Sequence, residues 1–295
     1  MRTKEILLSL LKAGNGAYIS GEELAQRLSL SRASVWKAVS ALRKDGYEID
    51  AATNKGYRLS PQNDVLSTQG VRNYLSPALQ GMAIEVLPVA SSTNTILRQR
   101  ALGAARSESV LIAASQTEGR GRRGRSFFSP ADTGVYMSLL LQPEHYTAGQ
   151  AEKLTAMAAL AACEAIEAVS QKSAAIKWVN DIYIAGKKVC GILCESRLMG
   201  SGAFAVCGIG VNLIQNEDYF HQRELPYATS VRLATGVSLS PDKAAAAIMN
   251  ELEPLYQSFA EKGFASLREE YRRQCVTLGR QVRVTYGGET REGEA

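Results

Sequence analysis

The chain has 295 residues, 45% of them hydrophobic and 21% charged, which supports a packed core and excludes a disordered or low-complexity protein. At roughly 100–200 residues per domain, this length predicts two domains with a fragment of a third. No apolar run reaches the ~20 residues of a membrane span. The five scattered cysteines favour a reducing compartment, so we expect a cytoplasmic protein with no membrane partner. With only two histidines, a histidine-rich metal site or a histidine-based catalytic triad is not expected.

The net charge of +5 is unevenly distributed. Residues 1–60 carry a net charge of +4, and four arginines lie within the seven residues 119–125. The rest of the chain is nearly balanced in charge. Two local basic features on a balanced chain predict two separate anionic partners.

The first 60 residues predict a winged helix-turn-helix. Ser20 and Glu23 have the spacing of a capping box at the start of a helix. A tight turn at residues 29–31 and a helix over about 32–44 follow, and this second helix has one apolar face. Residues 47–59 alternate around a turn sequence and predict a hairpin wing.

The outer face of the second helix and the wing tip carry side chains of the kinds that contact phosphates and base edges. These predicted DNA-binding residues are Arg32, Ser34, Trp36, Lys37 and Lys55. The alternative is a small helical module that binds protein or merely packs. Residues 61–65 are polar and contain proline, and we expect a linker there.

In the central region, a predicted strand at 84–87 leads to Ser92, Thr93 and Asn94, which suit a helix N-terminus with backbone N–H groups directed at a ligand. A second strand at 110–114 leads through Gln116 into the arginine-rich segment. That segment contains glycines in a G-x-G-x-x-G pattern. A dinucleotide fold is rejected because the spacers are arginines and the following Phe-Phe-Ser-Pro begins a helix poorly. We expect a flexible cationic loop that an anionic ligand orders, the alternative being a solvated basic loop.

Further along, Lys177, Asn180, Asp181 and Lys188 lie near strand ends and a hairpin turn. Together they could hold an anion and a divalent cation, although a solvated turn fits the spacing equally well. In a strand at 204–213, Gly208, Gly210 and Asn212 recur at a spacing of two. Such glycines allow close approach by a flat ligand, or they only relieve crowding in a curved sheet.

In this order behind a winged helix, the motifs Ser92-Thr93-Asn94, GRGRRGR, KWxND, GKK-x-x-GIL-x-E and GIGVNL resemble the family of bifunctional biotin protein ligases and biotin-operon repressors. The resemblance spans nearly the whole chain. It implies an α+β fold with a winged helix-turn-helix at 1–60, a linker at 61–65, a central mixed-sheet biotin/lipoate-ligase-like domain at 66–275 and an incomplete SH3-like barrel at 276–295. The family barrel is longer, so we expect a truncated C-terminal domain.

The resemblance also implies a reaction and its partners. Biotin and ATP, with Mg²⁺, would form biotinyl-5′-adenylate, and biotin would pass to a lysine of the biotin carboxyl carrier protein of acetyl-CoA carboxylase. Biotin would thus be both substrate and co-repressor precursor, because the adenylate-bound form would dimerise and bind operator DNA. Adenylation needs no histidine base, since a carboxylate is already a nucleophile at neutral pH. Cations that hold two anions in line should supply the catalysis.

By resemblance, each ligand receives a set of residues. The biotin set is Ser92, Thr93, Asn94, Gln116, Arg120, Gly121, Arg122 and Lys188. The ATP and adenylate set is Arg120, Arg122, Lys177, Asn180, Asp181 and Asn212. The catalytic set is Arg122, Lys177 and Lys188, and Asp181 is a candidate Mg²⁺ ligand. Two rivals remain open: a DNA-binding regulator that binds biotin or its adenylate without ligating it, and a lipoate-type ligase.

Overall fold

A computed structural model describes residues 3–14, 16–44, 47–60, 66–103, 109–142, 151–199 and 202–295. The chain divides into two compact units, Met1–Tyr74 and Leu75–Ala295. The predicted linker at 61–65 lies outside the described residues. Within the described ranges, no helix is both long and apolar enough to cross a membrane.

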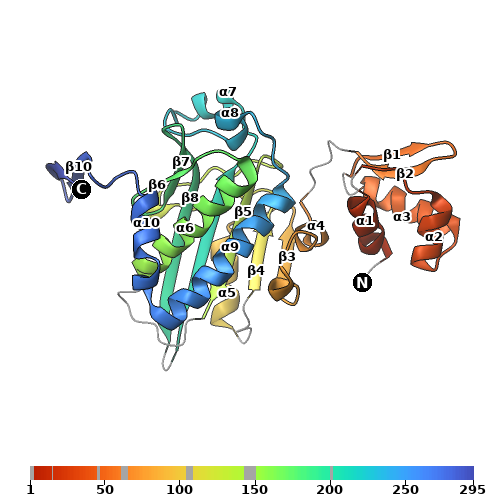
Figure 1. The fold of residues 1–295 in the computed structure, drawn as a ribbon, viewed down its shortest axis with the longest axis horizontal. Helices are drawn as coiled ribbons and strands as arrows, with labels where there is room; N and C mark the ends of the chain where they lie inside the picture. The colour runs from red at the N-terminus through yellow and green to blue at the C-terminus, as the bar shows by residue number, and fades with distance from the viewer. Residues whose placement is uncertain are drawn as a thin grey trace. The chain divides into compact units, whose positions relative to one another are not determined.

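The N-terminal unit is the predicted winged helix-turn-helix (Figure 1). Its elements are α1 (Thr3–Ala13), α2 (Gly21–Leu28), α3 (Arg32–Lys44), β1 (Ile49–Ala52), β2 (Gly56–Leu59) and α4 (Thr68–Arg72). Ser20 caps α2 by accepting a hydrogen bond from the Glu23 backbone N–H at 3.0 Å, and β1 pairs with β2 antiparallel. Ser29 ends α2 in the left-handed conformation, with φ 53°. Leu7, Leu24 and Val39 are fully buried in the core that joins the helices.

The second unit is built on a seven-stranded mixed sheet with the order β3-β4-β5-β9-β8-β7-β6. Its strands are β3 (Ala83–Leu87), β4 (Ser109–Ala113), β5 (Gly134–Leu141), β6 (Ala175–Lys177), β7 (Asp181–Ile184), β8 (Lys187–Met199) and β9 (Gly202–Asn212). Only the β3–β4 pair is parallel, and the other pairs are antiparallel. The mixed sheet expected for the central domain is therefore confirmed.

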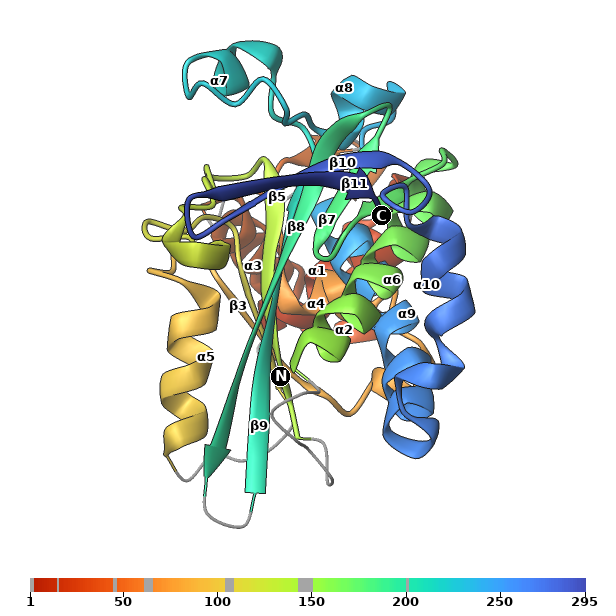
Figure 2. The same ribbon diagram turned by 90° about the vertical axis from the view of Figure 1, so that its left-hand side faces the viewer.

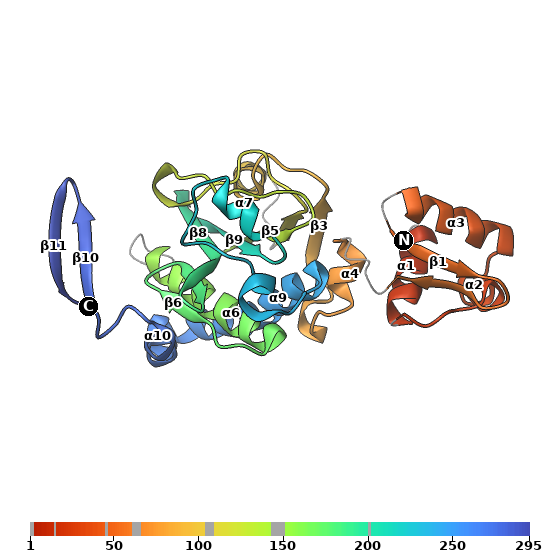
Figure 3. The same ribbon diagram turned by 90° about the horizontal axis from the view of Figure 1, so that it is seen from above.

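Helices cover both faces of this sheet (Figures 2 and 3). On one face lie α6 (Ala151–Ser170), α9 (Pro241–Lys262) and α10 (Arg268–Gln274), and on the other lies α5 (Thr93–Leu102). The alanine-rich α6 is buried along most of its length, because small side chains let it approach the strands and α9 closely. Two short helices follow β9, namely α7 (Glu217–His221) and α8 (Val231–Thr235). Single 3₁₀ turns occur at Pro77–Leu79, Arg122–Gly124 and Phe264–Ser266.

The chain ends in one antiparallel hairpin, β10 (Gln281–Tyr286) and β11 (Glu289–Glu294). Its side chains are largely exposed to solvent. Residues 276–295 thus contain one strand pair where the resemblance implies an incomplete barrel. A backbone bridge from Cys275 to Ile176 connects the segment before the hairpin to the edge strand β6.

The alternation of side chains along β8 and β9 decides what faces α5. Leu193 on β8 pairs with Gly208 on β9, and Gly191 pairs with Gly210. Since side chains alternate between the two faces of a strand, these positions share one face of the sheet. Asn94 of α5 packs directly on Gly208 at this face, which leaves a hollow between α5, the loop after β4 and the sheet.

Candidate functional site

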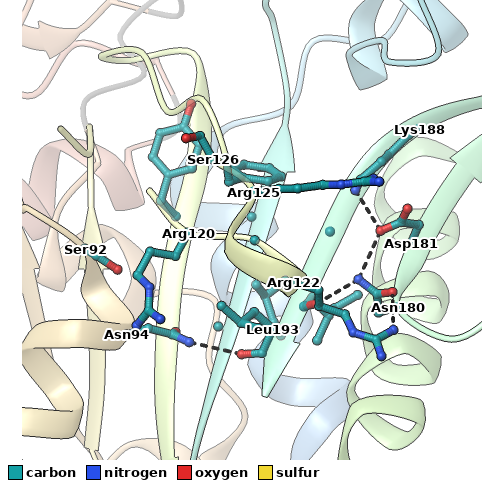
Figure 4. A pocket seen from close by; sticks show the side chains of 18 of the residues that line it. Ser92, Asn94, Arg120, Arg122, Arg125, Ser126, Asn180, Asp181, Lys188 and Leu193 are labelled. Carbon is teal, nitrogen blue, oxygen red and sulfur yellow. Dashed lines mark hydrogen bonds and ion pairs between the residues drawn. The ribbon is translucent and has the colours of Figure 1, made fainter. Parts of the chain in front are cut away.

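Most of the predicted site residues surround one cavity of about 480 Å³ on the α5 side of the sheet (Figure 4). Eleven of the twelve predicted residues line it: Ser92, Thr93, Asn94, Gln116, Arg120, Gly121, Arg122, Lys177, Asn180, Asp181 and Lys188. They come from α5, the loop between β4 and β5, and strands β6 to β8, so only the folded sheet brings them together. The cavity has a buried polar end at α5 and a cationic end at β7 and β8.

The polar end is formed by the start of α5. Ser92 caps the helix, and Ser92, Thr93 and Asn94 are all buried. The Thr93 backbone N–H donates to Gln116 Oε1 at 2.8 Å, and Gln116 Nε2 donates to Ser129 Oγ at 2.9 Å. The N–H of Thr93 is therefore already bonded to a side chain, and the polar groups of this end are held in a fixed arrangement.

Ser138 belongs to this polar end, although sequence reasoning missed it. Its hydroxyl is fully buried on β5, donates to Asn94 Oδ1 at 2.6 Å and lies 2.7 Å from Thr93 Oγ1. Asn94 Nδ2 in turn donates to the Leu193 carbonyl and to Glu195 Oε2, both at 3.1 Å. A lone hydroxyl residue within the apolar run of β5 was the available signal.

The arginine-rich loop is folded against the cavity. The Gly121 N–H donates to the Arg125 carbonyl at 2.7 Å, and the Phe127 N–H donates to the Gly119 carbonyl at 2.8 Å, which closes the loop at its base. Arg122 donates to Asn180 Oδ1 at 3.0 Å across the cavity. Apart from one 3₁₀ turn the segment starts no helix, in agreement with the rejection of a dinucleotide-binding loop.

The cationic end lies on the hairpin of β7 and β8. Lys188 Nζ and Asp181 Oδ1 are 2.7 Å apart, with 21% and 24% of their side chains exposed. Asn180 Nδ2 donates to Asp181 Oδ1 at 3.2 Å, so Asp181 links Lys188 to the contact between Asn180 and Arg122. Lys177 donates to the Tyr183 hydroxyl at 3.5 Å and lies over the Tyr183 ring. Figure 4 shows the Arg125 side chain pointing towards this same end.

Gly191 and Gly210 on the sheet face are covered by an aromatic ring of the protein itself. A Cβ added to Gly210 would lie 2.5 Å from the Phe127 ring, and one added to Gly191 would lie 3.2 Å from it. The Phe127 ring also meets Tyr136 edge to face, with centroids 6.3 Å apart. Burial raises the pKa of the Tyr136 hydroxyl, which donates to the Pro130 carbonyl. The glycines therefore admit a flat group, and in this structure that group is Phe127, a second residue that sequence reasoning missed.

Asn212 does not line the cavity. Its Nδ2 donates to the Thr229 carbonyl at 3.2 Å, and its Oδ1 accepts from Gln215 Nε2 at 3.2 Å. Both ends of the amide thus join β9 to the segment that follows it. A contact between Asn212 and adenine remains a prediction.

The predicted DNA-binding face lies on the N-terminal unit. Arg32, Lys37 and Lys55 are exposed, and Trp36 is 59% exposed, whereas Ser34 is half-buried next to Ser31. Arg32 forms only a loose ion pair of 4.0 Å with Glu22. An exposed tryptophan beside exposed cations on one helix face is unusual for a helix that merely packs, and it suits contact with a polyanion.

Comparisons with known proteins agree with this arrangement. A model of the biotin/lipoate A/B protein ligase family matches residues 86–212, and a helix-turn-helix domain model matches residues 2–58. The bifunctional ligase/repressor BirA of Bacillus subtilis (strain 168) is 33% identical over 95% of this chain and 86% of the relative. BirA of Escherichia coli (strain K12) is 29% identical over 95% of this chain and 85% of the relative. The biotin protein ligase of Aquifex aeolicus, solved with biotin and ATP, has a TM-score of 0.62 and 28% identity, covering 72% of this chain and 86% of that chain.

Proposed function

This chain belongs to the family of the bifunctional ligase/repressor BirA, and on that premise we propose that it joins biotin to ATP as biotinyl-5′-adenylate and then passes biotin to a lysine of a biotin carboxyl carrier protein. It is a biotin protein ligase with a helix-turn-helix repressor domain. The observation that carries the proposal is the convergence of four arginines and two lysines on a cavity with a buried, hydrogen-bonded polar end. This charge suits two anionic substrates, and the polar end suits one small uncharged ring system.

The chemistry needs positioning and charge neutralisation more than proton transfer. A free carboxyl has a pKa of about 4, so biotin arrives as a carboxylate that is already nucleophilic. One carboxylate oxygen attacks the α-phosphorus, a new O–P bond forms, and the bond from that phosphorus to the bridging oxygen breaks as pyrophosphate leaves. Because both reactants are anionic, fixed cations that face the developing charge lower the barrier.

The residues divide between the two ends of the cavity. We assign the biotin ring to the polar end, formed by Ser92, Thr93, Asn94 and Gln116, where donors and acceptors are held rigidly. Arg120 and Gly121 cover that end from the loop. The biotin carboxylate would then point towards Lys188 and Arg122. Lys188 now pairs with Asp181, so binding would exchange this carboxylate partner for that of biotin and would release Asp181 to bind a cation.

The phosphates belong at the cationic end, with Arg122, Lys177 and Asn180 around them. Mg²⁺ prefers oxygen ligands and usually binds through one or two carboxylates plus substrate phosphates. Among the described residues, no three or more His, Cys, Asp or Glu side chains are grouped so that they could hold a metal ion, and Asp181 is the carboxylate that lines the cavity. This donor set fits Mg²⁺ delivered with ATP and held by Asp181. When bound, the ion would neutralise phosphate charge.

The second half of the proposal concerns repression. We propose that the adenylate-bound chain dimerises and binds operator DNA through α3 and the wing. The support is the exposed face of Arg32, Trp36 and Lys37 together with the exposed Lys55 at the turn between β1 and β2. Such contacts position a recognition helix in the major groove.

The test is biotin-dependent release of pyrophosphate from ATP in Mg²⁺, measured on the 295-residue chain. We expect release with biotin and a 10²- to 10³-fold loss of rate in Arg122→Ala and Lys188→Ala, the scale for removing one group that stabilises the transition state. Arg100→Ala is the matched control. It removes the exposed ion pair between Arg100 of α5 and Glu85 and should retain the wild-type rate.

Three results would contradict the proposal in different ways. Biotin binding without pyrophosphate release would identify a regulator that does not ligate. Release with lipoate and none with biotin would identify a lipoate-type ligase. The absence of both binding and pyrophosphate release with either acid would reject the assignment of the cavity.

A further inference from the structure

We propose that Glu195 is a positioning residue for the biotin end of the site: it fixes the Asn94 amide and holds the base of the arginine-rich loop against the sheet. The proposal rests on the function proposed above and deepens it. Glu195 does not line the main cavity. It lies behind the wall of that cavity and borders a second hollow with Arg98, Arg197 and Phe204, so it acts through its neighbours.

Glu195 on β8 contacts side chains from two other parts of the fold, α5 and the arginine-rich loop. From β8, its Oε2 accepts from Asn94 Nδ2 at 3.1 Å. Its Oε1 lies 3.1 Å from a guanidinium nitrogen of Arg120 in the loop and 3.4 Å from one of Arg98 on α5. The carboxylate is 21% exposed, so these contacts are only partly screened by solvent.

The contact with Asn94 determines which way round the amide is held. Ser138 donates to Asn94 Oδ1, and the Leu193 carbonyl accepts from Nδ2. The second N–H of Nδ2 is directed at Glu195. A carboxylate only accepts hydrogen bonds, so Glu195 keeps the NH₂ group of the Asn94 amide on its own side and the amide oxygen towards Ser138.

The contact with Arg120 acts on the loop. Four arginines within seven residues repel one another, which opposes a folded loop. Glu195 pairs with the first of them, and Arg120 forms a backbone bridge with Ser126 at the loop base. Glu195 therefore attaches the base of the loop to β8. The tip of the loop is held separately, by the contact of Arg122 with Asn180.

The two roles can be separated by choice of substitution. Glu195→Gln keeps an acceptor for Asn94 but removes the charge that pairs with Arg120 and Arg98, while Glu195→Ala removes both. Glu85→Gln is the matched control. Glu85 on β3 forms an exposed ion pair with Arg100 of α5, and neither residue lines the cavity.

We expect the KM for biotin in pyrophosphate release to rise about tenfold in Glu195→Gln and about a hundredfold in Glu195→Ala, since a hydrogen bond to a charged group contributes on that scale. The kcat at saturating biotin should stay within about twofold of wild type. Glu85→Gln should match wild type in both constants. A loss of kcat without a rise in KM, or equal behaviour of Glu195→Gln and Glu85→Gln, would overturn the proposal.

A second readout does not depend on ligase activity. Trypsin cleaves after arginine, so the rate of cleavage within residues 119–125 of the intact chain reports how firmly the loop is held. Without any ligand, Glu195→Gln should be cut several times faster there than wild type, and Glu85→Gln should not. If the wild-type chain released no pyrophosphate, the proposed function would fail. The cleavage rates would still decide whether Glu195 holds the loop, and equal rates in the two variants would show that it does not.

Discussion

Replacing Gly208 with alanine is expected to weaken biotin binding by displacing Asn94. A Cβ at Gly208 would lie 2.1 Å from Asn94 Oδ1 and 2.8 Å from Asn94 Cγ, distances at which one group must move. Gly208 lies in the central strand β9, paired with β5 on one side and β8 on the other, so the strand cannot yield easily. The Asn94 side chain must therefore shift, and it carries hydrogen bonds to Ser138, Leu193 and Glu195.

The size of the effect follows from these contacts. Each intramolecular hydrogen bond contributes about 1 kcal/mol net, and overpacking a filled site costs about 1–3 kcal/mol. We expect the free energy of unfolding to fall by about 2–3 kcal/mol. The loss of one oriented polar wall of the biotin end should raise the dissociation constant for biotin about ten- to thirtyfold, equivalent to about 1.4–2 kcal/mol.

Calorimetric titration with biotin and urea denaturation measure the two quantities on the same protein. Gly81→Ala is the control, because a Cβ added there meets no atom within 4 Å. Wild-type affinity for biotin in Gly208→Ala, together with an unchanged free energy of unfolding, would refute the argument that Asn94 needs the space above Gly208.

Three further changes test other parts of the molecule. Burial, aided by the nearby carboxylates of Glu251 and Glu270, raises the pKa of Glu164 to about 7. Ionising this carboxyl therefore costs more in the folded chain than in the unfolded one, and its contribution to stability falls as the pH rises from about 4.5 to 7. Glu164→Gln should raise the Tm above wild type at pH 8 and leave it nearly unchanged at pH 4.5; an equal change at both pH values would contradict the shift. Ser29→Gly should raise the free energy of unfolding of the N-terminal unit by about 1 kcal/mol in urea, since a left-handed φ of 53° suits glycine better; no gain would mean that Ser29 is not strained. Lys37→Ala should weaken operator binding and lower the slope of log affinity against log salt by about 1, without changing pyrophosphate release, and an unchanged salt slope would place Lys37 off the DNA.

Much of the local structure followed from sequence patterns. The helix N-cap at Ser20, the helix over 32–44 and the hairpin wing were predicted within a residue or two, because capping, apolar periodicity and turn residues act over short distances. The arginine-rich loop was correctly separated from a dinucleotide-binding loop by its spacer residues.

The site depended on the tertiary structure to a greater extent. Sequence motifs named most of the residues that line the cavity. The lone hydroxyl of Ser138 within an apolar run did not show which side chain it would contact, and Phe127 was not assigned to the site. The pairing of β5 with β9 places Ser138 beside Asn94, and the fold of the arginine-rich loop places the Phe127 ring over Gly210. Asn212 shows the converse case, since its amide is used by Thr229 and Gln215 within the fold.

Motifs and local patterns along the chain therefore establish the family, the order of elements and the types of side chain available for binding two anions. Which of those side chains face one another depends on the fold. Capping, turns and amphipathic periodicity are set by neighbours along the chain. The opposition of Glu195 to Arg120, or of Lys188 to Asp181, is set by strand register and by which face of the sheet α5 covers.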